Sequence, residues 1–186
     1  MRTAVCMMSY LFDLVLLLYS LVMKLEIGVG FRECGQYSFR PRVTGSDVVY
    51  LDIKPPEVKV DNPWIVADAQ YLPFRDGVFE EVYASHLIEH LSDPALFLKE
   101  CYRVLRYEGI LRIWCPNVFS KNMYRDPSHI FRPNPYLLKK LLTRVGFQAH
   151  FDCPPVGSLF PIPFRVLFRY LYLFLADEIR VIAWKG

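Results

Sequence analysis

Glycines and carboxylates follow three short apolar runs of this sequence, and their spacing suggests a site for a ligand that contains a ribose. Glu26, Gly28 and Gly30 follow the first run, where glycines allow a tight turn and close approach of the backbone to a ligand. Asp52 ends the second run, 22 residues beyond Gly30. An acid about 20 residues after a glycine turn can accept hydrogen bonds from ribose hydroxyls. Asp68 follows the third run, so the three signals should meet at one edge of a parallel sheet.

A second polar group, from Ser85 to His90, follows the fourth apolar run. The spacing from His86 through Glu89 to His90 matches H-x-x-E-H, a motif in which two histidines bind zinc and the glutamate acts as a base. The helix that could carry the motif is short, because residues 92–94 already begin the next helix, and no third ligand is evident. We therefore expect no metal, with His86 lining the site, His90 capping or packing, and Glu89 solvated.

His129 lies in a polar loop that follows the fifth apolar run. In a parallel sheet this loop faces the same crevice as the ends of the preceding strands. Two roles stay open for His129: a general base or substrate contact, or a hydrogen-bonding residue within its loop.

Strands and helices that alternate along the chain must position these residues. Short β-rich runs predict strands at 22–27, 47–53, 64–66, 79–84, 110–115, 147–151 and 178–184. Helical spacing of apolar residues predicts helices at 95–106, 135–145 and 164–175. This alternation predicts an α/β domain with a parallel sheet and helices on its faces. The segment between Gly30 and Asp47 shows no convincing helix, and we expect a loop or a distorted helical turn there.

The composition limits the class of protein. A length of 186 residues suits one domain, and an apolar share of 53% with 16% aromatic residues excludes intrinsic disorder. A net charge of +3 is too small to indicate nucleic-acid binding, and no basic stripe is present. The five cysteines include no C-x-x-C pair, so we expect reduced, packed thiols in a cytoplasmic protein.

Residues 1–22 are almost entirely apolar, and three interpretations stay open. They are an extension upstream of a true start at Met23, a packed N-terminal helix, or a membrane anchor. Asp13 disfavours the anchor because a carboxylate near the middle of a membrane span is costly. We therefore expect a single domain over residues 23–186.

The stretch from Leu25 to Asn117 resembles the class I S-adenosylmethionine-dependent methyltransferases, and among them the type 11-like subgroup with a short first crossover. The segments that carry the resemblance are LEIGVG, VVYLDI, VADAQYLPFRDGVFEEVYASHLIEHLSDP and FLKECYRVLRYEGILRIWCPN. The run from Val66 to Asn117 is the most specific part. The resemblance implies a Rossmann-like, mostly parallel sheet of seven strands, with helices on both faces and the last strand antiparallel.

The resemblance also implies roles in binding S-adenosylmethionine as cofactor. Glu26, Gly28 and Gly30 would form the loop beneath the methionine part. Asp52 would hold both ribose hydroxyls, and Ile53 would pack on the adenine.

Residues after the third and fourth strands would complete that site. Asp68 would accept a hydrogen bond from the adenine amino group, and the backbone of Ala69 would meet a ring nitrogen. Ser85 and His86 would lie beside the sulfonium and its methyl group. We expect His86 and His129 to be the residues closest to the chemistry.

The chain departs from the family pattern in two places. Phe31 and Arg32 stand after Gly30, so the third glycine of the usual loop is missing, and Glu80 replaces the usual Asp. We expect a methyltransferase that acts on a small-molecule, glycan or lipid-linked acceptor. The alternatives are a catalytically inactive binding module and a nucleotide-sugar or dinucleotide enzyme on the same type of fold.

Residues 152–176 should form a lid or helical insertion in the domain. The apolar stretch 164–175 carries Arg165 and Arg169 one helical turn apart. It fits a helix buried on the sheet, a lid, an oligomer surface, or an interfacial helix with arginines at lipid headgroups. The last interpretation would give peripheral membrane contact. The oligomeric state stays open.

Overall fold

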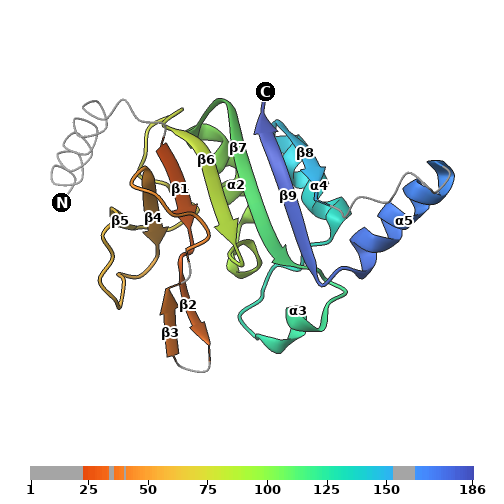
Figure 1. Ribbon diagram of the computed structural model, residues 1–186, viewed down its shortest axis with the longest axis horizontal. Coiled ribbons are helices and arrows are strands. Elements are labelled where there is room, and N and C mark those ends of the chain that lie inside the picture. The colour runs from red at the N-terminus through yellow and green to blue at the C-terminus, as the bar shows by residue number, and fades with distance from the viewer. Residues whose placement is uncertain (1–22, 34–35, 40, 153–161) are drawn as a thin grey trace.

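The computed structural model describes residues 23–33, 36–39, 41–152 and 162–186 of the chain (Figure 1). Its main feature is a seven-stranded sheet with the order β5-β4-β1-β6-β7-β9-β8. Neighbouring strands are parallel except at β9, which runs antiparallel to both β7 and β8. The predicted Rossmann-like sheet with an antiparallel last strand is confirmed. The expectations for residues 1–22 and for 153–161 fall outside the described residues.

The strands lie close to the positions predicted from the sequence. They are β1 (Met23–Ile27), β4 (Val48–Asp52), β5 (Trp64–Val66), β6 (Phe79–Ser85), β7 (Leu105–Pro116), β8 (Phe147–Phe151) and β9 (Glu178–Lys185). The largest difference is the early start of β7. A shift in register lets Leu105 pair with Phe79 before the regular ladder resumes at Ile110.

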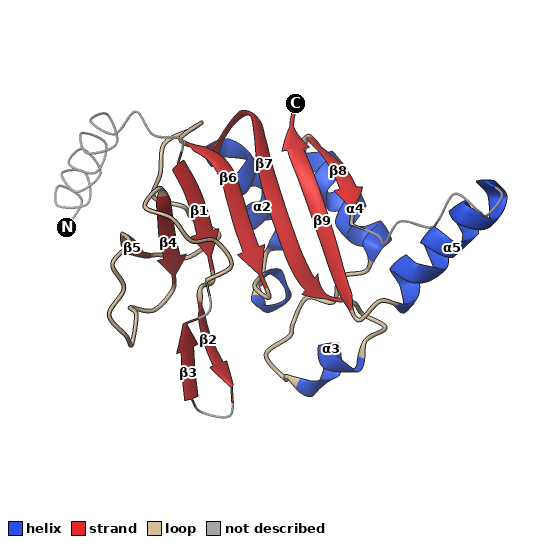
Figure 2. Cartoon of the chain, in the orientation of Figure 1, coloured by secondary structure: helices blue, strands red, loops and turns tan. Residues whose placement is uncertain are grey.

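Two helices, α2 (Pro94–Val104) and α4 (Pro135–Val145), pack on one face of the sheet. Before each helix, the side chain of Asp93 or Asn134 accepts a hydrogen bond from the first turn, and a proline follows at the first helical position. These are strong helix-start signals, because the side chain satisfies an N–H without an intrahelical partner. Gly146 ends α4 in the left-handed conformation. The two helices contact each other, and Figure 2 shows both behind the sheet.

The hydrophobic core lies between this face of the sheet and the two helices. Alternate side chains of the central strands point into it, including Leu25, Val82 and Leu111. Cys101 and Cys115 are free and buried within the core, which confirms the packing role predicted for them, and burial raises the pKa of both thiols well above the ordinary value.

The opposite face of the sheet is lined by charged and aromatic side chains. Glu81 and Arg112 form an ion pair at 3.0 Å, and the guanidinium groups of Arg42 and Arg180 lie over the Trp114 ring at 4.9 and 5.2 Å. Within the described ranges, no helix packs on this face. Helices were predicted on both faces of the sheet, and the structure has them on one face. Cation–π and ionic contacts take the place of a packed helix over β6, β7 and β9, and a small apolar cluster of Val29, Val43, Val48 and Tyr50 covers β4.

The first crossover differs from the loop or distorted helical turn expected between β1 and β4. It contains a hairpin of β2 (Gly30–Glu33) and β3 (Gln36–Phe39), which form a separate two-stranded sheet. The second segment, QYSF, alternates polar and aromatic residues, a pattern that favours strands, whereas the first, GFRE, does not, and each run is too short to stand out. Two other short elements, η1 (Ile88–His90) and α3 (Lys121–Arg125), were also missed.

The helix α5 (Ile162–Leu175) extends away from the sheet at the right of Figure 1. Phe164, Leu167 and Leu175 are 60%, 56% and 78% exposed, whereas Leu173 packs against the core. The interpretation of this stretch as a helix buried on the sheet is therefore wrong. None of the helices described is both long enough and apolar enough to cross a bilayer.

Candidate functional site

A glycine turn follows β1 and is held against the end of the neighbouring strand β4. Gly28 has a φ of +78°, and a Cβ atom there would lie 3.1 Å from the Leu87 side chain. This position therefore requires glycine. The backbone N–H of Gly30 donates a hydrogen bond to Asp52 Oδ2 over 2.9 Å. The structure brings together the turn and the acid that the sequence spacing had paired.

Glu26 lies beneath this turn and is 2% exposed. Its two carboxylate oxygens accept hydrogen bonds from the backbone N–H groups of Arg42 and Val43, at 2.7 and 2.9 Å. Burial raises the pKa of Glu26, and the two N–H donors oppose that increase. Glu26 therefore fixes the end of the first crossover to β1 and shapes the loop from below.

Asp52 and Asp68 lie at the same edge of the sheet. Asp52 pairs with Val66 in the parallel ladder, and the N–H of Ala67 donates to the Asp52 carbonyl over 3.0 Å. Asp68 follows directly, and its Oδ1 accepts a hydrogen bond from the Gln70 N–H at 2.8 Å. The two carboxylates thus follow adjacent strands, as the parallel-sheet argument required.

The neighbours of these acids differ in exposure. Ile53 is 66% exposed next to Asp52, so it presents an apolar surface to a ligand at this edge. Ala69 is 6% exposed and packs in the core, which leaves its backbone as the part able to meet a ligand.

Ser85 ends β6 with a buried hydroxyl that has no hydrogen-bond partner. A buried polar group without a partner costs free energy unless a ligand or water supplies the hydrogen bond. Ser85 therefore marks a place where a polar group of a ligand fits.

His86 lies between two carboxylates in a left-handed backbone conformation, with a φ of 51°. Its Nδ1 is 3.4 Å from Glu89 Oε1, and its Nε2 is 3.2 Å from Glu178 Oε1. The Glu89 carboxylate raises the pKa of His86 most, burial of the ring opposes this, and Glu178 adds to the increase. Both ring nitrogens of His86 already face a carboxylate, so the geometry favours lining and orienting over proton abstraction.

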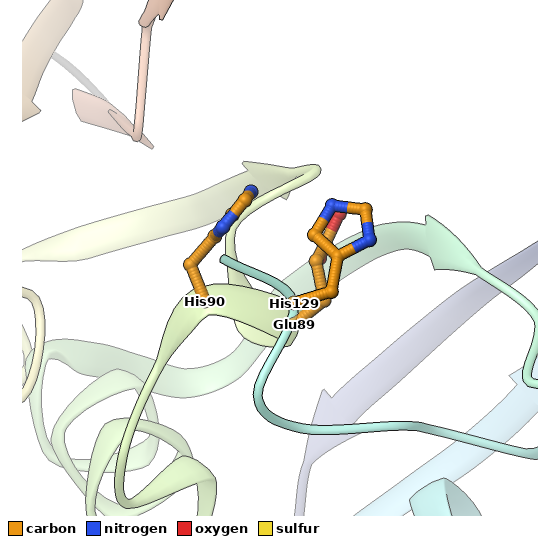
Figure 3. Close-up of side chains that lie close together, drawn as sticks. All are labelled: Glu89, His90 and His129. Carbon is orange, nitrogen blue, oxygen red and sulfur yellow. The ribbon is translucent and has the colours of Figure 1, made fainter. Parts of the chain in front are cut away.

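The loop that carries His129 comes to the end of β6, as predicted. Its Nδ1 lies 3.0 Å from the Met123 carbonyl oxygen, and its ring packs edge-on against His90 with centroids 4.7 Å apart. Figure 3 shows His90, His129 and Glu89 side by side, from η1 and from the loop after α3. His129 thus lies beside η1, with one ring nitrogen already paired.

Glu89 was expected to be solvated, and that expectation is wrong. Its side chain is fully buried, and neither carboxylate oxygen has a hydrogen-bond partner. The short turn of η1 directs Glu89 inward beneath the loop after β7, where the Phe131 N–H donates to the Glu89 carbonyl at 3.0 Å. A polar residue in a one-turn element carries no periodic signal that could have shown this.

Two further polar residues were missed. Glu178 contacts His86 from the first position of β9, and Asn117 is fully buried after β7. The Asn117 side-chain amide donates to the carbonyl oxygens of Leu173 and Ala176, at 2.9 and 3.1 Å, and so fixes the end of α5. Their partners lie far away in the sequence, so no local pattern indicated either residue.

Known proteins are similar to this chain in both sequence and fold. The family model described as "Methyltransferase domain" matches residues 25–113. A probable S-adenosylmethionine-dependent methyltransferase from Mycobacterium tuberculosis is 35% identical over 104 residues, which is 54% of this chain and 36% of that protein. Another from Mycolicibacterium smegmatis is 37% identical over 82 residues, 42% of this chain and 32% of that protein. The chain therefore spans about a third of the length of these relatives.

The fold matches a solved structure over nearly its whole length. A SAM-dependent methyltransferase from Archaeoglobus fulgidus superposes with a TM-score of 0.62 at 21% identity, covering 95% of this chain and 94% of that one. Together the sheet topology and the sequence matches support a class I S-adenosylmethionine-dependent methyltransferase domain that includes residues 25–113.

S-adenosylmethionine is the cofactor that this family and fold imply, and three features of the chain fit it. A Cβ atom at Gly28 would crowd Leu87, the Ser85 hydroxyl lacks a partner, and Ile53 exposes an apolar surface beside Asp52. The roles of individual residues in binding the cofactor stay predictions.

Proposed function

We propose that this chain binds S-adenosylmethionine at the carboxyl edge of β1, β4, β5 and β6 and transfers its methyl group to a small-molecule, glycan or lipid-linked acceptor. The observation that carries the proposal is the joint placement of the glycine turn, Asp52 and Asp68 at one edge of the sheet. The match of residues 25–113 to the methyltransferase domain model supports it.

The two acids retain the capacity to bind the adenosyl group. Asp52 accepts one backbone hydrogen bond at each oxygen, from Gly30 at 2.9 Å and from Lys54 at 3.1 Å. An ionised carboxylate has about four acceptor positions, so Asp52 can still accept from both ribose hydroxyls. Asp68 can accept from an adenine amino group in the same way.

Methyl transfer from a sulfonium is an in-line displacement, so the chain mainly has to align the two reactants. Ser85 and His86 are placed at the end of β6 to orient the reacting groups. The Met123 carbonyl oxygen can only accept a hydrogen bond, so the proton of His129 sits on Nδ1. Nε2 then keeps a lone pair that can take a proton from a hydroxyl or amine acceptor.

One observation favours the alternative of an inactive binding module. The hairpin strand β2 begins at Gly30, so the glycine turn leads into a strand. A helix N-terminus would have offered extra N–H donors to the cofactor. An inactive module would bind acceptor-like molecules while showing no transfer of the methyl group.

We also propose that α5 contacts a membrane surface, which would suit a lipid-linked acceptor. The support is the group of apolar side chains that it leaves exposed: Phe164, Leu167, Phe168, Leu171, Tyr172, Phe174 and Leu175. Such a surface is typical of interaction sites. A cytoplasmic location stays a prediction.

Calorimetry with S-adenosylhomocysteine tests the cofactor site. We expect saturable binding to the wild-type chain and roughly tenfold weaker binding to Asp52→Asn, because the amide has fewer acceptor positions. Asp61→Asn is the matched control, since the Asp61 side chain is 91% exposed and lies in the loop between β4 and β5. Absence of binding to the wild-type chain, or equal affinity in Asp52→Asn, would overturn the proposal.

A further inference from the structure

We propose that Glu89, His90 and His129 form a binding site for one divalent first-row transition-metal ion, such as Zn²⁺ or Mn²⁺. Each residue offers one ligand atom, and the three atoms lie within 4.8 Å of one another (Figure 3). The H-x-x-E-H stretch alone predicts no metal, because it has no zinc-binding helix and no evident third ligand. In the structure the third ligand is His129, which lies in a loop nearly forty residues further along the chain. His86 is not part of the cluster.

The buried carboxylate of Glu89 is the first argument for a cation. Glu89 is 0% exposed, and both of its oxygens lack hydrogen-bond partners. Burying an unpaired charge is costly, so a carboxylate in this position needs a positive partner. His86 Nδ1 stands 3.4 Å from Glu89 Oε1 on one side, and the other Glu89 oxygen has no partner. A metal ion held jointly with His90 and His129 would satisfy the carboxylate directly.

The hydrogen bonds around His90 supply the second argument. The Ser128 hydroxyl donates to Asp126 Oδ1 at 2.6 Å, so its oxygen is left to accept from His90 Nδ1 at 3.0 Å. That assignment places the His90 proton on Nδ1 and the lone pair on Nε2. A metal-binding histidine usually donates its other N–H to a carboxylate, carbonyl or hydroxyl in this way.

A hydrogen bond at Nδ1 fixes the tautomer of His129 as well. Its Nδ1 faces the Met123 carbonyl at 3.0 Å, which again leaves the lone pair on Nε2. The Asp126 carboxylate lies 4.0 Å from that nitrogen and adds negative charge beside the cluster. Both imidazoles are therefore held in the tautomer that can bind a cation.

The donor set indicates the type of ion. Two imidazole nitrogens and one carboxylate suit Zn²⁺, Mn²⁺, Fe²⁺ or Co²⁺ better than Ca²⁺ or Mg²⁺, which prefer oxygen ligands. Three protein ligands also leave at least one coordination position for water or for an oxygen of another molecule.

The position of the metal site has a consequence for methyl transfer, which rests on the proposed function. The three residues follow β6 and β7, beside Ser85 and His86, where the acceptor would approach the methyl group. A hydroxyl bound to the ion would lose its proton more readily. The ion would then occupy the lone pair of His129 and replace that histidine as the group that activates an oxygen acceptor.

Titration of the metal-free chain with Co²⁺, followed by its visible spectrum, tests the site without any methyl transfer. We expect one equivalent to bind with nitrogen and oxygen ligands, displaceable by Zn²⁺, and at least about tenfold weaker binding in His90→Ala and in His129→Ala. His150→Ala is the matched control, because His150 lies on the edge strand β8, and it should bind like the wild type. If an alanine variant fails to fold, Ser128→Ala keeps all three ligands, removes the hydrogen-bond partner of His90 together with one hydrogen bond to Asp126, and should also weaken binding.

Three results would overturn the proposal. They are no saturable binding of Co²⁺ or Zn²⁺, unchanged affinity in His129→Ala, or thiolate bands that assign the ion to cysteines. Binding of S-adenosylhomocysteine is measured separately on the same samples. Cofactor binding without metal binding refutes only the metal site, and metal binding without cofactor binding refutes only the proposed methyltransferase function.

Discussion

The backbone N–H of Gly30 donates to the carboxylate of Asp52 over 2.9 Å, although the two residues are 22 positions apart. This bond joins the turn after β1 to the end of β4. The two parts of the predicted cofactor site are therefore held in place before any ligand binds, which lowers the entropy that binding must overcome.

Replacement of Gly28 by alanine should weaken both the fold and the site. The left-handed φ of +78° and the contact of 3.1 Å with Leu87 should together cost about 1–3 kcal/mol of unfolding free energy. Urea denaturation measures this loss, and calorimetry measures the expected loss of S-adenosylhomocysteine affinity. Gly77→Ala is the matched control: it has a φ of +71° but meets no atom closer than 3.9 Å, so it should keep the affinity. Equal affinities in the two variants would contradict the prediction.

Glu100 should contribute pH-dependent stability. Its carboxylate accepts from the Leu72 N–H at 2.8 Å and pairs with Arg103, which lowers the pKa of Glu100 below its ordinary value of 4.5. A lowered folded-state pKa stabilises the fold above the unfolded value and loses that effect as the pH falls through the folded value. Glu100→Gln should therefore cost roughly 1 kcal/mol at neutral pH and progressively less below pH 4.5. A difference that stays constant in urea titrations from neutral to acid pH would refute this, with the exposed Asp61→Asn as control.

Removal of the Asn117 side chain should loosen the junction between α5 and the sheet. Asn117→Ala leaves the carbonyl groups of Leu173 and Ala176 without their donor, and a loss of about 1–3 kcal/mol is expected for a buried polar group left unpaired. Hydrogen exchange should accelerate at Ala176, whose N–H donates to Tyr172 at 2.8 Å. The exposed Asn122→Ala variant should leave that exchange rate unchanged, and unchanged exchange in both variants would count against the role of Asn117.

Charges placed on α5 should abolish its contact with membranes. The double variant Leu167→Asp and Leu171→Asp places carboxylates at side chains that are 56% and 49% exposed. Its co-sedimentation with anionic vesicles should fall several-fold relative to the wild type. Tyr107→Asp, at a side chain that is 71% exposed on β7, is the control and should co-sediment normally. If the double variant binds vesicles as well as the wild type, α5 does not supply the contact.

Most of the main sheet was predictable because it depends on local signals. Apolar runs bounded by turn residues located the strands, and Pro94 and Gly146 marked ends of the two packed helices. The hairpin β2–β3 was not predictable, since two four-residue strands are stabilised by pairing with each other. The sequence left several interpretations of α5 open, because a largely apolar stretch does not show whether the core has room for it.

The residues of the candidate site also fall into those that local signals predicted and those that depend on distant contacts. Gly28, Gly30, Asp52 and Asp68 sit at strand ends, so the parallel topology alone brings them together. The burial of Glu89 and the approach of Glu178 to His86 depend on how loops fold over the sheet. Such contacts between distant segments leave no trace in residue spacing.

The charged and aromatic face of the sheet has a consequence for which strands must be covered. Arg42 and Arg180 over Trp114, with the Glu81–Arg112 pair beside them, tolerate hydration in a way that a leucine-rich surface would not. Wetting of that side therefore carries little penalty along β6, β7 and β9, whereas over β4 the first crossover covers apolar side chains through Val43.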